Sequence, residues 1–127
     1  MRIKSLLLIF LIFISGCALT PERIVKNPDK IIEICSKIEN QENDACITKY
    51  ASEVSLLSKE TGINLCNKIA SNSLKNKCLF KIFSVYEKSG RLEEGIEVCK
   101  NIDIVGFPEW CETRRSVESI AVSPPIV

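Results

Sequence analysis

Histidine is absent from the 127 residues, so the side chain that most often acts as a general base in enzymes is missing. No Cys-x-x-Cys pair occurs, and the five glycines are dispersed, so no glycine-rich phosphate-binding loop is present. The carboxylates are scattered along the sequence, and no acid and base pair stands out among them. These absences predict that the protein is not an enzyme and uses no dissociable cofactor.

A surplus of charge of either sign is also missing. Lysine and arginine number 17, and aspartate and glutamate number 16. A nucleic-acid binder needs a basic surplus to displace counterions from phosphates, so we expect no nucleic-acid partner. No polybasic cluster stands near the N-terminus, and charge alone is therefore not expected to hold the chain at a membrane.

Long hydrophobic runs are confined to the N-terminus. Arg2 and Lys4 precede the apolar run 5–13 (SLLLIFLIF), which is shorter than the roughly 20 residues of a membrane span. A charged start, an apolar run and small residues after it are typical of a secretory signal peptide. The alternative interpretation is an uncleaved N-terminal anchor in which Cys17 is an ordinary thiol.

The tetrapeptide Ile14-Ser15-Gly16-Cys17 follows this run and resembles the lipobox of bacterial lipoproteins. The resemblance implies removal of residues 1–16 and covalent attachment of lipid to the sulfur and the freed amine of Cys17. Each buried methylene contributes about 0.8 kcal/mol, so several acyl chains make a stable anchor. Ala18 stands where an aspartate would be the usual signal for retention in the inner membrane. We therefore expect the periplasmic face of the outer membrane, or the outer face of the cell membrane where only one membrane exists.

The rest of the sequence divides into three predicted parts. Residues 17–29 contain Pro21 and Pro28 and are predicted to form a short tether. Residues 30–122 are predicted to form a helical-repeat domain. Residues 123–127 (SPPIV) are predicted to form a flexible tail.

A motif of the form Ile-x-aliphatic-Cys-x-x-Ile occurs three times, beginning at Ile32, Ile63 and Ile96. A second cysteine follows the first after 11 or 12 residues in every copy, and a basic residue stands three positions later. The second cysteines are Cys46, Cys78 and Cys111, and the basic residues are Lys49, Lys81 and Arg114. This regularity is the signature of a repeat protein.

Apolar residues at helical spacing lie on both sides of the polar break in each copy. Examples are Ile32, Cys35 and Ile38 before the break, and Cys46, Tyr50, Val54 and Leu57 or Cys78, Ile82 and Tyr86 after it. The segments 40–44 and 71–76, and Gly106 with Pro108, are predicted turns, and Gly62 and 89–90 are predicted helix stops. We expect an all-α fold of about three stacked antiparallel helical hairpins, because one hairpin alone cannot bury its apolar face.

The segment 86–96 (YEKSGRLEEGI) resembles the turn between the two helices of a tetratricopeptide repeat. The repeat length also approaches that of the family. Gly95 stands where the family usually has alanine, and the cysteines are foreign to it. The resemblance implies a TPR-like short solenoid.

The simplest cysteine pairing is Cys35–Cys46, Cys66–Cys78 and Cys99–Cys111. Each pair flanks a predicted turn, which would bring its two Cα atoms within bridging range. Pairing across the other turns would join Cys46 to Cys66 and Cys78 to Cys99. This alternative would leave Cys35 and Cys111 unpaired at opposite ends of the array. Each short loop would contribute about 3 kcal/mol when closed.

Metal binding and thiol redox chemistry are the alternatives for these six cysteines. Histidine is absent and the cysteine spacings do not match those of zinc-ligand pairs, so we expect no metal. Cys17 alone lies outside the three pairs, and lipidation would account for it.

Two aromatic residues and two arginines follow the last repeat. Phe107 and Trp110 are predicted to cap the core, with an exposed anchor for a partner as the alternative. Arg114 and Arg115 are candidates for a binding patch or for an ordinary helix surface.

Taken together, these features predict a lipid-anchored envelope lipoprotein. Its disulfide-stapled helical domain would act as a protein-protein interaction or assembly-accessory module, with an envelope protein held in a groove between hairpins. The alternative is a structural or immunity-type surface lipoprotein without a groove-bound partner.

Overall fold

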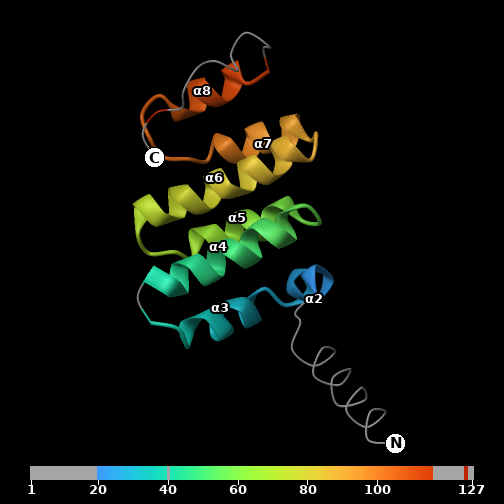
Figure 1. Cartoon of the computed structure of the whole chain (residues 1–127), viewed down its shortest axis with the longest axis vertical. Helices are drawn as coiled ribbons and strands as arrows, with labels where there is room; N and C mark the ends of the chain where they lie inside the picture. The colour runs from blue at the N-terminus through green and yellow to red at the C-terminus, as the bar shows by residue number, and fades with distance from the viewer. Residues whose placement is uncertain (1–19, 40, 116–124, 126–127) are drawn as a thin grey trace, which may run out of the picture.

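The structure, a computed structural model, describes residues 20–39, 41–115 and 125. Within these residues it has seven helices and no strand, which confirms the predicted all-α fold (Figure 1). The helices are α2 (Pro21–Lys26), α3 (Asp29–Ser36), α4 (Gln41–Ser55), α5 (Lys59–Asn67), α6 (Asn72–Lys88), α7 (Leu92–Cys99) and α8 (Phe107–Thr113). The predicted leader 1–16, Cys17 and nearly all of the predicted tail 123–127 lie outside the described residues.

The helices form a stack along the long axis of the molecule, from α3 at one end to α8 at the other (Figure 1). α4 packs extensively on α5, and α6 packs on α7 in the same way. α4 also packs on α6, which joins the two pairs into one array. α4 and α6 run in the same direction, so equivalent positions of successive repeats lie side by side (Figure 1).

Polar residues that were predicted to break the chain instead begin helices. α4 starts at Gln41 and α6 starts at Asn72, so most of 40–44 and 71–76 is the first turn of a helix. Ser71 is the N-cap of α6, and its hydroxyl accepts a hydrogen bond from the Leu74 amide. Side chains of this kind are favoured there because they satisfy amides that have no partner within the helix.

The two predicted helix stops have different outcomes. Gly90 follows the C-cap of α6 with a φ of 75°, which confirms the stop at 89–90. The stop predicted at Gly62 is wrong, because this glycine is buried inside α5 and α4 already ends at Ser55. A Cβ atom on Gly62 would lie 2.8 Å from the Cβ atom of Ser55. The glycine therefore permits close contact between two helices.

The tether predicted for 17–29 is wrong in part, because Pro21–Lys26 forms α2. Pro21 occupies the first turn of this helix, where a missing amide hydrogen costs nothing. Ile24 is only 1% exposed in the core, and α2 packs on α4. Hydrophobic burial of this one side chain accounts for the attachment of the short helix.

The predicted apolar faces are buried along most of the array. Cys78, Ile82 and Tyr86 are all 0% exposed, as expected. Leu57 is 57% exposed because it lies beyond the end of α4, and Ile38 is 37% exposed beyond the end of α3. The periodicity identified the faces correctly, whereas the helix ends decided which of their residues reach the core.

Candidate functional site

Three disulfides close the turns between α3 and α4, between α5 and α6, and between α7 and α8. The Cα–Cα distances are 5.7 Å for Cys35–Cys46, 5.6 Å for Cys66–Cys78 and 5.9 Å for Cys99–Cys111. The sequential pairing predicted from the spacing is therefore confirmed. All of these cysteines are buried except the half-buried Cys46.

Hydrogen bonds from the last part of α6 and from the turn between α6 and α7 tie this region to the end of α4. The Tyr86 hydroxyl donates to the carbonyl of Ser55, and Arg91 Nη1 donates to the carbonyl of Leu56 at 2.8 Å. Burial raises the pKa of Tyr86, so the phenol remains a donor. The Arg91 guanidinium lies 4.9 Å from the centroid of the Tyr86 ring. A hydrogen bond from Arg91 also lowers the pKa of Glu94.

The two candidate aromatic residues belong to the core. Phe107 is 0% exposed and Trp110 is 7% exposed, with their ring centroids 5.3 Å apart. Phe80 and Phe83 of α6 pack against this pair. The core-capping prediction is thus confirmed, and the alternative of an exposed anchor is wrong for Phe107 because its ring is completely covered.

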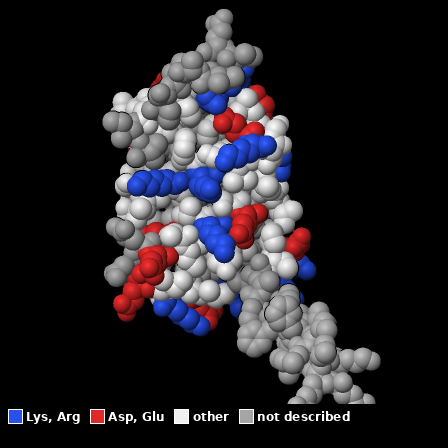
Figure 2. Space-filling model, viewed as in Figure 1, with Lys and Arg blue, Asp and Glu red and all other residues white. Residues whose placement is uncertain are grey.

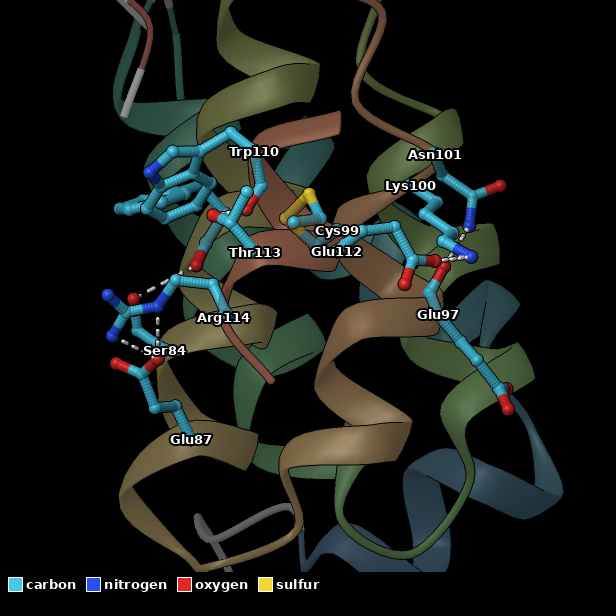
Figure 3. Close-up of a disulfide and its surroundings, with 12 residues drawn as sticks. Ser84, Glu87, Glu97, Cys99, Lys100, Asn101, Trp110, Glu112, Thr113 and Arg114 are labelled. Carbon is cyan, nitrogen blue, oxygen red and sulfur yellow. Dashed lines mark hydrogen bonds and ion pairs between the residues drawn. A yellow bond between two sulfur atoms is a disulfide. The ribbon is translucent and has the colours of Figure 1, made fainter. Parts of the chain in front are cut away.

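Both candidate arginines form ion pairs within the chain. Arg114 Nη2 lies 2.7 Å from Glu87, toward which the side chain extends in Figure 3, and its guanidinium lies 5.4 Å from the Trp110 ring centroid. Arg115 pairs with Glu93 at 2.8 Å, and its hydrogen bond lowers the pKa of Glu93. These contacts fit a helix-surface role that fixes the end of α8, while partner binding by the two arginines stays a prediction.

A hollow of about 730 Å³ lies on the surface formed by α4 and α6. We call it the α4–α6 groove. A smaller hollow of about 340 Å³ lies between α3 and α5. Small side chains on α4 leave room in the α4–α6 groove. The groove is lined by Glu42, Asp44, Ala45, Thr48, Lys49, Ser52, Glu53, Leu74, Lys77 and Lys81.

The charged side chains of this groove form no ion pairs within the described residues, whereas several of those toward the C-terminal end of the array do. Every ion pair found in the described part of the chain joins residues among Lys59 and 87–115, and none involves a groove residue. The pairs elsewhere include Lys59 with Glu97, whose hydrogen bond raises the pKa of Lys59. Figure 2 shows both signs of charge on the face over α4 and α6. The groove charges are therefore not held in ion pairs, although Lys49 Nζ lies 5.8 Å from the centroid of the Tyr50 ring.

Sequence reasoning missed this groove, although one signal pointed to it. Lys49 and Lys81 are the basic residues that recur three positions after the second cysteine of a repeat. The third member of the series, Arg114, is engaged with Glu87. Only the packing of α4 beside α6 reveals that the first two members share one surface.

Within 20–39, 41–115 and 125, no cluster of three or more histidine, cysteine, aspartate or glutamate residues could hold a metal ion. Among those same residues, no helix has the length and hydrophobicity required to cross a membrane.

No protein-family model, characterised protein or solved structure matches this chain.

Proposed function

We propose that the protein is a lipid-anchored envelope lipoprotein whose helical domain binds a partner protein. The signal-peptide pattern and the tetrapeptide ending at Cys17 support the lipid anchor. The disulfides support it as well, because they use every other cysteine and require an oxidising compartment. Anchored in this way, the domain would stand at the periplasmic face of an outer membrane, or outside a single cell membrane.

The proposed domain is a TPR-like solenoid that uses its surface for recognition and has no active site. The packed helix pairs and the turn at 86–96 support this relationship. Solenoids of this kind offer extended surfaces to their partners.

The observation that carries the interaction proposal is the α4–α6 groove. Its volume of about 730 Å³ lies within the range of about 300–1,000 Å³ that is typical of binding pockets. Its charged side chains have no ion-pair partner among the described residues, whereas several of those in the α7–α8 region form ion pairs. A partner segment can therefore pair with these charges without breaking existing ion pairs, and the other contact to consider is that of Lys49 with the Tyr50 ring.

Photo-crosslinking in living cells tests this function. A photoreactive amino acid replaces Ala45, which is exposed in the groove, and in a control it replaces Ala70, which is exposed outside it. We expect one dominant protein adduct from position 45 and none from position 70. The same adducts from both positions, or no adduct from either, would contradict the proposal and favour a structural or immunity-type surface lipoprotein.

A further inference from the structure

The α4–α6 groove has an ordered pattern of charge along its length. Glu42 and Asp44 stand at the start of α4, and Glu53 stands near its end. Between these acidic ends lie three lysines, Lys49 from α4 together with Lys77 and Lys81 from α6. The sequence of charges along the groove is therefore acidic, basic and acidic.

The parallel course of α4 and α6 places the lysines together at the centre. Lys49 stands three residues after Cys46, and Lys81 stands three residues after Cys78, so the two occupy equivalent positions of neighbouring helices (Figure 1). Lys77 lies one turn earlier on the same face of α6, because residues four apart in a helix are neighbours. Three positive charges at the centre of a groove, contributed by both of its helices, favour an acidic ligand.

The length of the pattern sets the size of the ligand. Glu42 and Glu53 are 11 positions apart on α4, which corresponds to about 16 Å at 1.5 Å per residue. An extended chain advances about 3.3 Å per residue, so about five residues cover this distance. The groove is therefore matched to a short linear segment of a polypeptide.

We propose that the α4–α6 groove binds an extended segment of the partner protein that has acidic residues at its centre and a basic residue at each end. The central carboxylates pair with Lys49 and Lys81, and the flanking basic residues pair with the acidic ends of the groove. This inference rests on the proposed interaction function and specifies the chemistry of its partner. Because all of these contacts are electrostatic and near the surface, binding weakens as the salt concentration rises.

A phage-displayed library of random peptides, presented to the full-length protein in detergent, tests the proposal. We expect the enriched peptides to share an acidic centre with basic flanks. The double variant Lys49→Glu with Lys81→Glu should bind these peptides at least tenfold more weakly, and should instead select peptides with a basic centre. The matched variant Lys30→Glu with Lys37→Glu changes two exposed lysines of the α3 region by the same charge and should bind like the wild type.

Circular dichroism and intact disulfides verify that both double variants are folded. Enrichment of peptides without an acidic centre, no enrichment, or equal binding by the two double variants would overturn the proposed charge pattern. The crosslinking at Ala45 is independent of this library. A specific adduct in cells, together with a negative library, would overturn the charge pattern and leave the interaction function standing. If neither the crosslinking nor the library gave a positive result, both the interaction function and the charge pattern would be overturned.

Discussion

At the scale of single residues, the end of α4 shows how one helix pair is fixed to the next. The last carbonyls of an α-helix lack partners within the helix. At the end of α4 the carbonyls of its last residue, Ser55, and of the next residue, Leu56, accept hydrogen bonds from Tyr86 and Arg91, which stand on either side of the turn after α6. The turn that follows one long helix therefore caps the long helix of the preceding repeat.

Tyr86→Phe removes the phenolic donor and leaves the shape of the side chain almost unchanged. The buried carbonyl of Ser55 then loses this hydrogen bond, so the free energy of unfolding should fall by about 1–3 kcal/mol. Denaturant unfolding without reductant measures this as a lower midpoint at an unchanged slope. Tyr50→Phe is the control, because Tyr50 is only half-buried and should change stability by less than about 0.5 kcal/mol. Equal effects of the two substitutions would contradict this role of Tyr86.

At the scale of elements, the contact between α4 and α5 depends on the absence of a side chain at Gly62. An added Cβ atom would meet the Ser55 side chain at 2.8 Å, the Ala51 carbonyl at 3.1 Å and the Ile82 side chain at 3.2 Å. A backbone carbonyl cannot move without displacing the helix that contains it. The two helices are therefore held at a distance that only glycine allows.

Gly62→Ala sets intrinsic helix propensity against packing. Alanine is favoured over glycine in a helix by about 1 kcal/mol, but overpacking of a tight contact costs about 1–3 kcal/mol. We expect a net loss of stability, measured by thermal or denaturant unfolding. Asn64→Ala on the exposed side of α5 gains propensity without a clash and should be neutral or slightly stabilising. A Gly62→Ala variant more stable than the wild type would show that the helices separate at little cost.

The same residues show how far the sequence alone could predict the elements. The spacing of Cys66 and Cys78 predicted two helices joined by a bridged turn, because both signals are local. The role of Gly62 could not be predicted, since a helix stop and a close helix contact require the same residue. The burial of Ile24 and the α4–α6 groove were missed for a related reason, because each depends on which helix lies beside which.

At the scale of the whole molecule, the bridges are distributed along the entire array, whereas the ion pairs among the described residues are confined to the part from α5 to α8. Each disulfide closes a loop of 11 or 12 residues and should contribute about 3 kcal/mol by restricting the unfolded chain. Ion pairs reinforce the array from α5 to α8, where Lys59 reaches Glu97 and Arg114 reaches Glu87. The charged groove residues of α4 and α6 form no ion pair within the described residues, although α6 also carries Glu87, the partner of Arg114.

Export connects this architecture with the N-terminal tetrapeptide. Bridges of this kind persist in oxidising compartments outside the cytosol. The proposed leader would deliver the chain to such a compartment, and the proposed lipid would use the one cysteine that the bridges leave over. The bridged scaffold and the proposed lipid anchor would therefore depend on the same proposed export.

Mass mapping of the unreduced full-length protein, isolated from membranes, tests this account most directly. The proteolytic peptides should contain only the bridges Cys35–Cys46, Cys66–Cys78 and Cys99–Cys111, and the mature chain should begin at a lipid-modified Cys17. Loss of the lipid-bearing peptide and accumulation of the uncleaved precursor in Cys17→Ser provide the control. Free thiols at the six other cysteines, bridges between different repeats, or an unmodified Cys17 would contradict the account.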